Sequence, residues 1–588
     1  MNTNIEQSLS LNGNMWKFVP YNEHDAETIA SKYDLPVCVA SIIASRGIPA
    51  DEVEKFLQPK LQSLMPDPFC LKDMEKGIKR IADAVEKNEQ IAIIGDYDVD
   101  GATSSSLLKL FLESLGCHIL LHIPEREEGY GPNRNMVDEF WAAHAKLLIT
   151  TDCGTSAFDA LEYAQNKDMD VVVLDHHEAE TLLPKVYAVI NPKRLDESDD
   201  YPYLKYMAAV GVVFLAVVAI NRELRQRGYY QTHQAPDLMH WLDLVALGTV
   251  CDVVPLIGLN RAFVRQGLKI MSLRQNKGLK ALADKAALTS APTGYHLGYV
   301  LGPRINAGGR VGEASTGSKL LCAEDDLTAA ALAEKLDTFN AQRKEIEAYV
   351  LLQAIEILEG TPQNYPMAFV YGHDWHQGVI GIVAGKLKER YNLPSFVMSV
   401  EADEVKGSAR SVAGLNIGAL IMAAKEKGIL TKGGGHHMAA GFSLKAEDIE
   451  KFREFAGEYT QEHLGKEKIV PVVEIDSVIS LSAATIELAD KLSLLEPFGA
   501  GNPEPKLMIH DVRISKPSIV GSGHIRCFLS SLTGGTLKAM VFKAADTELG
   551  KALLNQRGET FNIVGTLRKD SWMGKTQLQF IIEDAMRG

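Results

Sequence analysis

Three aspartates stand at alternate positions directly after a short apolar run. The run covers residues 91–94, and the carboxylates are Asp96, Asp98 and Asp100. If this stretch is extended, alternate side chains point the same way and the three carboxylates converge. Their mutual repulsion is costly unless a cation neutralises it, and such oxygen ligands suit Mg²⁺ or Mn²⁺. A helical pattern follows, so the stretch predicts a divalent-metal site at a strand-to-helix turn.

The acidic triplet has two other interpretations. The spacing also opens an EF-hand calcium loop, which needs a bidentate glutamate at its twelfth position. Counted from Asp96, that position holds Leu107, so the calcium-loop interpretation fails. A solvated turn without a ligand stays open for this triplet taken alone.

Three later apolar runs also end in residues that can bind metal. Residues 147–151 precede Asp152, residues 171–174 precede Asp175, His176 and His177, and residues 244–250 precede Cys251 and Asp252. One such aspartate is commonly only a helix cap, but repetition favours a shared site. If all the runs are parallel strands, their carboxyl ends meet at one sheet edge. The side chains expected to meet there are Asp98, Asp100, Asp152, His176 and Asp252.

The wider pattern indicates the elements that would position these residues. Residues 88–323 alternate strand and helix signals, which is typical of a doubly wound parallel sheet. Residues 326–359 predict one long helix with an apolar stripe that includes Leu327 and Tyr349. A second α/β unit is expected at about 366–465. Short alternating runs from about residue 469 to 586 predict a β-rich module with OB-like spacing.

The motif segments carry a family resemblance. The regions around Asp98, Asp152, His176 and Asp252 resemble the four motifs of the DHH phosphoesterases, in particular the branch of bacterial single-strand-specific 5′→3′ DNA exonucleases. Further similar segments occur in the same order at residues 45–48, 56–61, 123–131, 302–310, 407–411 and 434–441. Gly309 and His437 depart from the pattern, where alanine is expected, and neither is a proposed ligand.

The resemblance implies a fold and a domain order. It implies an α/β protein with a DHH-type parallel-sheet core, joined by a long helix to a smaller DHHA1 α/β domain, and with a C-terminal β-rich OB-like domain. The expected divisions are an N-terminal extension at 1–85, a DHH domain at 86–325, a connecting helix at 326–360, a DHHA1 domain at 361–465 and an OB-like domain at 466–588.

The resemblance also assigns roles to residues. Two divalent ions, Mn²⁺ or Mg²⁺, would be bound by Asp96, Asp98, Asp100, Asp152, His176 and Asp252. Catalysis is expected from Asp98, Asp100, Asp152, His176, His177 and Asp252, with His177 orienting the scissile phosphate. Substrate binding is expected from Arg126, Arg304, Asn306, Arg310, Ser408, Arg410 and His436.

The expected activity is hydrolysis of single-stranded DNA from its 5′ end, with release of 5′-mononucleotides, in repair and recombination. One alternative is a DHH-type phosphodiesterase or polyphosphatase acting on a small substrate, which the β-rich C-terminal module disfavours. A non-catalytic nucleic-acid-binding scaffold is disfavoured because every expected ligand is present. A helicase and a single-strand-binding protein are expected partners by the resemblance alone.

Composition sets looser limits. The chain has 588 residues, which is long enough for several domains, and a formal net charge of −15. Such acidity opposes long-range attraction to DNA, so we expect a short, enclosed basic track and strong dependence on divalent ions. Seven cysteines without paired spacing and an N-terminus without a signal-peptide pattern favour the reducing cytoplasm. No apolar run spans a bilayer, and a monomer is expected.

Overall fold

The computed structural model describes residues 8–129, 131–361, 364–465, 470–531, 534–556, 558–572 and 575–588. Tyr130 and residues 466–469, which fall inside predicted segments, lie outside the described residues, as does the side chain of Trp572. The chain forms two compact units. One contains residues 60–467 and 499–502, and the other contains residues 1–59, 468–498 and 503–588.

The larger unit begins with a five-stranded parallel sheet, as the sequence predicts. The strand order is β3-β2-β4-β5-β6, and every neighbouring pair is parallel. The strands are β2 (Ile91–Gly95), β3 (Ile119–His122), β4 (Leu147–Thr151), β5 (Asp170–Leu174) and β6 (Ala188–Ile190). The strands β2 and β4 are buried along their whole length, because side chains on both faces are covered by helices.

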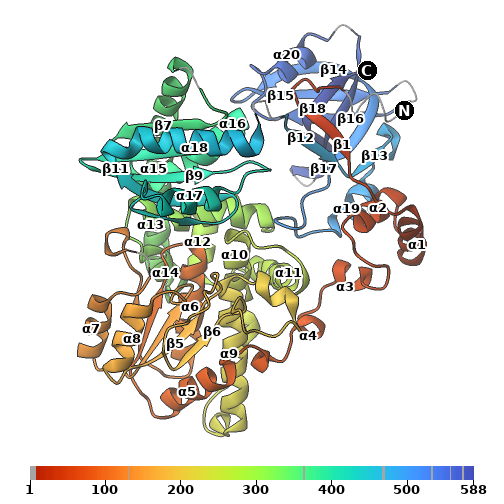
Figure 1. Cartoon of the computed structure of the whole chain (residues 1–588). Helices are drawn as coiled ribbons and strands as arrows, with labels where there is room; N and C mark the ends of the chain where they lie inside the picture. Colours follow the sequence, from red (N-terminus) through yellow and green to blue (C-terminus); the bar gives the residue numbers. More distant parts are fainter. Residues whose placement is uncertain are drawn as a thin grey trace. The chain divides into compact units, whose positions relative to one another are not determined.

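Helices cover the two faces of this sheet separately (Figure 1). Ile91 and Ile93 point into a core shared with α5 (Met74–Glu86), α6 (Val99–Ser114) and α9 (Ala209–Gln226). Ala92 and Ile94 point into the opposite core, which is formed with α7 (Arg134–Ala142) and α8 (Phe158–Asn166). This alternation along one strand produces the doubly wound arrangement.

After β6 the chain is helical up to residue 321 in the part that the structure describes. The prediction that residues 244–250 form a strand of the sheet is wrong, because they lie in α10 (Leu242–Cys251). Leu244–Leu247 are fully buried on all sides of that helix. The run is therefore continuously apolar and lacks the periodic pattern that would distinguish a helix from a strand. The remaining helices here are α11 (Gly258–Ser272), α12 (Lys277–Lys285), α13 (Gly302–Val311) and α14 (Thr316–Leu321), with a π-helical turn, η6, at His296–Leu301.

One long helix connects the two α/β parts of this unit. Helix α15 (Asp326–Gly360) begins after Asp325, whose side chain accepts a hydrogen bond from the N–H of Thr328. Its first half contributes Leu336 to the core of the parallel sheet, and its second half contributes Val350 to the core of the following domain. Part of the predicted apolar stripe is wrong, because residues such as Leu327 and Tyr349 are exposed.

The second α/β part is a mixed five-stranded sheet. Its order is β10-β11-β9-β8-β7, and only the β7–β8 pair is parallel. The strands are β7 (Ala368–His373), β8 (Ser395–Glu401), β9 (Glu404–Arg410), β10 (Lys432–Gly435) and β11 (Ala439–Lys445). Helix α16 (Gln377–Tyr391) packs with α15 on one face, while α17 (Ile417–Glu426) and α18 (Ile449–Leu464) cover the other, as Figure 1 shows.

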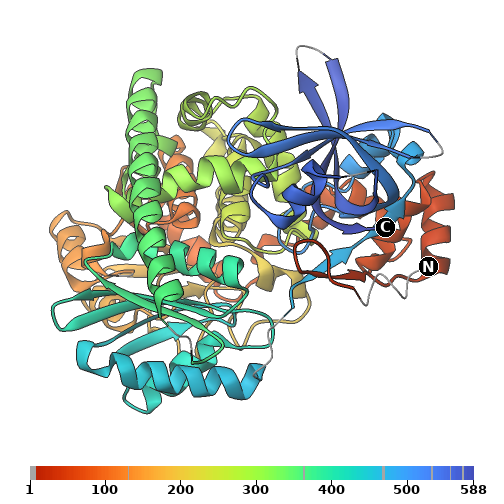
Figure 2. The ribbon, with the colours of Figure 1, turned by 90° about the horizontal axis from the view of Figure 1, so that it is seen from above.

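The smaller unit contains a closed β-barrel, which confirms the predicted OB-like module. Its strand order is β13-β14-β15-β16-β18-β17, and an additional β14–β17 pairing closes the sheet. The strands are β13 (Ser477–Ile479), β14 (Leu507–Val520), β15 (His524–Ser530), β16 (Thr536–Val541), β17 (Thr560–Trp572) and β18 (Lys575–Arg587). Figure 2 gives a second view of this barrel.

The N-terminal residues are divided between the two units. Residues up to 59 cluster with the barrel, and residues 60–85 cluster with the parallel sheet. In the barrel unit, β1 (Met15–Phe18) pairs in parallel with β12 (Val472–Ile475), and the helices α1 (Glu23–Tyr33), α2 (Val37–Ser45) and α3 (Val53–Leu57) follow. The N-terminal region is therefore more than helix and loop, and the five-part domain division stays a prediction. No helix among the described residues is both long and apolar enough to cross a bilayer.

Candidate metal centre and phosphate pocket

The acidic loop between β2 and α6 begins the candidate metal centre. Asp98 is the N-cap of α6, and its carboxylate accepts a hydrogen bond of 3.0 Å from the N–H of Gly101. A side chain at Gly101 would put a Cβ only 2.4 Å from the carbonyl oxygen of Asp96, so the tight turn requires glycine. The expectation that three alternate residues converge from an extended strand is wrong, because Asp100 already lies in the first turn of α6. Helical geometry and tertiary packing bring the carboxylates together instead.

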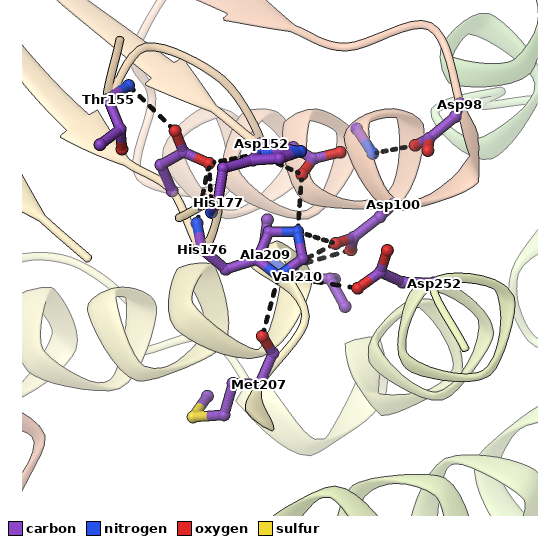
Figure 3. A network of polar contacts seen from close by, with 12 residues as sticks. Asp98, Asp100, Asp152, Thr155, His176, His177, Met207, Ala209, Val210 and Asp252 are labelled. Atoms are coloured by element: carbon purple, nitrogen blue, oxygen red, sulfur yellow. Dashed lines mark hydrogen bonds and ion pairs between the residues drawn. The ribbon is translucent and has the colours of Figure 1, made fainter. Parts of the chain in front are cut away.

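Asp100 joins this loop to a second helix. Its buried carboxylate accepts hydrogen bonds from the backbone N–H groups of Ala209, at 2.6 Å, and Val210, at 3.0 Å (Figure 3). These are the first residues of α9, where the helix dipole favours negative charge. Burial, followed by repulsion from Asp98, nevertheless raises the pKa of Asp100 to about 7. The carboxylate is held rigidly, but its charge is not fully compensated by the protein.

Asp152 lies directly after β4 in a left-handed conformation, with φ of 62°. Aspartate tolerates this region better than most residues. Burial and the nearby carboxylates, Asp100 foremost, raise the pKa of Asp152 well above its usual value. The left-handed turn therefore directs this carboxylate into the acidic cluster.

His176 brings its ring to the centre of the cluster (Figure 3). Its Nε2 lies 3.3 Å from Asp152 and 3.8 Å from Asp100, while its Nδ1 lies 3.0 Å from the carbonyl oxygen of Met207 and 3.6 Å from Asp252. Burial lowers the pKa of His176 to about 3, so the ring is neutral at pH 7. A proton on Nδ1 donates to Met207, which leaves the Nε2 lone pair directed at the carboxylates, as a metal ligand requires.

Asp175 organises the loop that carries both histidines. Its buried carboxylate accepts hydrogen bonds from the backbone N–H groups of Thr155 at 3.0 Å, His176 at 2.8 Å and His177 at 3.2 Å, and from the His177 ring at 2.8 Å. Burial alone would raise the pKa of Asp175, but the hydrogen bond and charge of His177 hold it below its usual range. The sequence analysis assigned no role to Asp175, although its position in the motif was a usable signal.

His177 behaves differently from its neighbour. Burial works to lower the pKa of this ring, but the hydrogen bond to Asp175 and the surrounding carboxylates raise it overall.

Asp252 completes the cluster at the C-terminal end of α10. Burial and the nearby Asp100 raise its pKa to about 9.

Three overlapping groups of donor atoms could hold metal ions. They are Asp96, Asp98 and Asp152; Asp152, His176 and His177; and Asp100, His176 and Asp252, each with ligand atoms within 4.8 Å of one another. The donor sets fit Mn²⁺ or Mg²⁺, since they are rich in carboxylates and contain imidazole. Asp96 supports the fit, because its Oδ1 is buried and has no hydrogen-bond partner among the described residues. Burial and repulsion from Asp98 raise the pKa of Asp96 to about 7, which a bound cation would reverse.

A basic pocket of about 460 Å³ adjoins the acidic loop. Arginines from three segments line it: Arg126, Arg310 and Arg410. The Arg410 guanidinium donates to the hydroxyl of Ser408 at 3.0 Å, so these two residues form one corner. No aspartate or glutamate of the described residues lines this pocket. The composition suits an anionic group with several oxygens, such as a phosphate.

The pocket concentrates positive charge. Burial, and then repulsion from Arg126 and Arg343, lowers the pKa of Arg310 to about 10. The Arg310 side chain also donates to the carbonyl oxygen of Gly378 at 3.0 Å, and Arg126 donates to that of Gly309. Buried like charges without carboxylate partners are costly, so an anionic ligand would relieve this repulsion.

Other predicted substrate residues do not line this pocket. Arg304 forms an ion pair of 2.9 Å with Asp337 on α15 and donates to the carbonyl oxygen of Val300, which is a structural role. Asn306 is half-buried in α13, and His436 is exposed between β10 and β11. Lys406 and Lys432, which were not among the predicted substrate residues, line the pocket on β9 and β10. Both stand within two residues of the segments 407–411 and 434–441, and this closeness in the sequence was a usable signal.

The barrel unit carries basic residues that are already paired. Arg568 forms an ion pair with Glu504, and Lys538 forms one of 3.2 Å with Asp570. These side chains are therefore stabilised without a ligand.

Comparison with known proteins adds family information. The DHH family N-terminal domain matches residues 90–249, the DHHA1 domain matches residues 364–462, and the RecJ OB domain matches residues 475–584. The chain is 34% identical to the single-stranded-DNA-specific exonuclease RecJ of Escherichia coli, over 95% of this chain and 97% of that protein. It is 31% identical to the RecJ of Bacillus subtilis, over 97% of this chain and 70% of that protein.

Solved structures give the same result. The crystal structure of RecJ from Thermus thermophilus in complex with Mn²⁺ matches with a TM-score of 0.80 and 26% identity, over 97% of this chain and 79% of that one. A second structure, of exonuclease RecJ bound to manganese, matches with a TM-score of 0.56 and 29% identity, over 68% of this chain and 95% of that one.

Proposed function

The chain belongs to the RecJ family of single-stranded-DNA-specific exonucleases, and from this membership we propose that it degrades single-stranded DNA from the 5′ end with divalent metal ions. The observation that carries the proposal is the adjacency of two features. An acidic cluster that fits metal ions lies beside a basic pocket that fits a phosphate. The two are joined by Arg126, whose guanidinium lies 4.6 Å from the centre of the Tyr97 ring in the acidic loop.

The proposed metal ligands are Asp96, Asp98, Asp100, Asp152, His176 and Asp252, for two ions of Mn²⁺ or Mg²⁺. The overlap of the donor groups at Asp152 and His176 supports two neighbouring positions. Bound ions would activate a water molecule and neutralise charge on the scissile phosphate. No protein nucleophile is required, and the pKa of the buried Cys153 and of the half-buried Cys251 is raised by removal of their thiols from water.

The chain's own residues would fix the substrate. In the proposal Arg126, Arg310, Ser408 and Arg410 bind the terminal 5′-phosphate, and His177 orients the scissile phosphate. The raised pKa of His177 supports a role as a hydrogen-bond donor to an anion. In the proposal the terminal phosphate is held at a fixed distance from the metal ions, so that 5′-mononucleotides would leave one at a time.

Selectivity for single strands would be steric. The pocket is lined both by Arg126 and Arg310 and by residues of the mixed sheet, so a strand end must enter between the two α/β parts. A duplex end is wider than a single strand and would be excluded. Helicase and single-strand-binding partners are proposed from the resemblance alone, a cytoplasmic location from the unpaired spacing of the cysteines and the N-terminal sequence, and a monomeric state from the several linked domains.

The test is a time course on single-stranded DNA labelled at either end, with Mn²⁺, Mg²⁺ or a chelator, beside a blunt duplex. We expect immediate release of the 5′ label as a mononucleotide from single-stranded DNA. A chelator should abolish this release, and the blunt duplex should not be cleaved. First release of the 3′ label would overturn the polarity. Intact DNA under every metal, with hydrolysis of a small phosphodiester, would overturn the substrate.

A further inference from the structure

A second pocket, of about 550 Å³, adjoins the other side of the acidic cluster. Arg126 of the basic pocket contacts Tyr97, which stands between Asp96 and Asp98, whereas this pocket is lined by Met207, whose carbonyl oxygen contacts His176, and by Val253, which follows Asp252. Its lining mixes charged side chains with apolar ones. We call it the exit pocket.

The backbone of Lys193 in the exit pocket is tied to the loops that carry the cluster. Asn191, which is fully buried, donates to the hydroxyl of Thr155 at 2.9 Å and to the carbonyl oxygen of His177 at 2.8 Å. The side-chain oxygen of Asn191 accepts from the N–H of Lys193 at 2.8 Å. The turn that carries Lys193 is therefore tied to the His177 loop and to the loop after Asp152.

The pocket lining places Lys193 on the His176 side of the cluster. Lys193 and Met207 both line the exit pocket, and the carbonyl oxygen of Met207 lies 3.0 Å from Nδ1 of His176. A cation in this pocket would attract a phosphate bound beside the candidate ligands.

The cations of the exit pocket differ in their ion pairing. Arg194 pairs at 2.8 Å with Asp73 and at 2.9 Å with Asp196, and its side chain is 9% exposed. Lys205 pairs at 2.7 Å with Asp199, whose side chain is 87% exposed, so this pair is weak. Lys193 pairs at 3.2 Å with Glu178, whose side chain is 67% exposed. Such an exposed pair is weak, so an arriving phosphate can replace Glu178.

The exit pocket also has apolar residues in its lining, beside the carboxylates of Glu178, Glu197 and Asp199. Val253 is 70% exposed and has φ of 59°, a conformation that is rare for a β-branched residue. It stands beside Tyr206 and Val254 in the lining. Strain of this kind persists where the surrounding structure holds it, and it is often found at functional sites. An exposed apolar surface in the same pocket as a lysine suits a nucleoside with an attached phosphate.

We propose that the exit pocket binds the nucleotide on the 3′ side of the scissile bond, with Lys193 contacting the next phosphate along the strand. This inference rests on the proposed function. If the 5′-phosphate lies in the basic pocket and the scissile phosphate at the acidic cluster, the strand must continue beyond the cluster. The exit pocket adjoins the cluster at His176 and Asp252, away from the 5′-phosphate.

The test combines a protein change with a substrate change. The substrates are a 5′-phosphorylated thymidine trinucleotide, the same trinucleotide with a neutral methylphosphonate between nucleotides two and three, and the 5′-phosphorylated dinucleotide, which lacks that phosphate. For the wild-type protein with Mn²⁺, the methylphosphonate should raise KM about tenfold, as expected for loss of one charge-assisted contact. This first comparison needs no variant.

Lys193→Gln should raise KM for the normal trinucleotide by a similar factor, and the methylphosphonate should add less than about twofold to it. Cleavage of the dinucleotide should be unchanged. Lys193→Arg should keep most of the wild-type behaviour. Lys72→Gln is the matched control, because Lys72 pairs with Asp196 outside the pocket lining and its loss removes the same charge.

The outcomes distinguish failure of this inference from failure of the proposed function. If the effects of Lys193→Gln and of the methylphosphonate multiply, Lys193 does not contact that phosphate and the inference is overturned. An equal loss on the dinucleotide would place Lys193 at the metal centre instead, which also overturns it. If the wild-type protein cleaves neither the oligonucleotides nor longer single-stranded DNA, the proposed function itself fails, and this inference fails with it.

Discussion

The guanidinium of Arg126 lies 4.6 Å from the centre of the Tyr97 ring, so the basic pocket and the acidic loop are in direct contact. Tyr97 stands between Asp96 and Asp98 in the sequence. This contact sets where a bound terminal phosphate would lie relative to the candidate metal ligands, because a stacked arginine keeps its planar fork in one orientation.

Tyr97→Leu should therefore weaken the positioning of Arg126. We expect KM for 5′-phosphorylated single-stranded DNA to rise about fivefold, the size of a partly buried cation–π contact. Tyr97→Phe keeps the ring and should behave like the wild type. Steady-state kinetics on a 5′-phosphorylated oligonucleotide measure both, and an equal effect of the two variants would contradict a role for the stacking.

Arg410→Lys should reduce the preference for a 5′-phosphate over a 5′-hydroxyl end. The lysine keeps the charge but loses the planar fork and the guanidinium donor that reaches the Ser408 hydroxyl. The ratio of kcat/KM for the two ends should fall about tenfold. Competition between differently labelled 5′-phosphorylated and 5′-hydroxyl strands gives that ratio directly. An unchanged ratio would remove Arg410 from the phosphate site.

Asp152→Asn should abolish cleavage while preserving the fold. Asparagine tolerates the left-handed conformation of this position, whereas alanine would add backbone strain. Loss of a shared metal ligand should lower kcat at least about a thousandfold, since metal assistance supplies several kcal/mol. Binding of single-stranded DNA, measured by fluorescence anisotropy, should stay within a few-fold. Metal-dependent cleavage by a pure preparation at near wild-type rate would refute the assignment.

Asp175→Asn should act on metal binding through the histidine loop. The amide cannot accept all the hydrogen bonds that the carboxylate receives from Thr155, His176 and His177. Mn²⁺ affinity, measured by isothermal titration calorimetry, should fall about 10- to 100-fold, as is usual for residues that orient ligands. Saturating Mn²⁺ should recover much of the activity. Loss of activity that no Mn²⁺ concentration recovers would indicate a direct catalytic role.

The acidic cluster should make the stability of the metal-free protein fall as pH rises, and a bound metal ion should reverse this dependence. In the metal-free protein the pKa of Asp96 and Asp100 is raised to about 7, and that of Asp252 to about 9. In the unfolded chain these groups titrate near pH ~4. Between those values the folded protein binds more protons than the unfolded one, so stability falls as pH rises.

Bound Mn²⁺ should reverse this trend, because it needs the carboxylates deprotonated. The gain in Tm on adding Mn²⁺ should therefore be larger at pH ~8 than at pH ~5.5. Differential scanning fluorimetry with and without chelator measures both slopes, and Asp252→Asn should flatten the metal-free slope. An equal Mn²⁺ gain at both pH values would contradict a buried carboxylate site.

The sequence by itself determined the parallel sheet and the position of most candidate ligands. Apolar runs such as residues 91–94 and 147–151 end in aspartates, and buried parallel strands bring their carboxyl ends to one edge. The long helix was equally visible, because α15 contains neither proline nor an internal glycine. The barrel was predicted from short runs in which apolar and polar residues alternate, because every second side chain of a strand faces the interior.

Tertiary structure decided what local pattern could not. A fully buried helix and a buried strand are both continuously apolar, so the helix that delivers Asp252 resembled a strand in the sequence. Likewise, Asp100 is held by the distant N–H groups of Ala209 and Val210, and Arg304 is paired with Asp337 on another helix. Which charged side chain meets a ligand and which meets a neighbour depends on contacts between residues far apart in the chain, and only the folded structure fixes these.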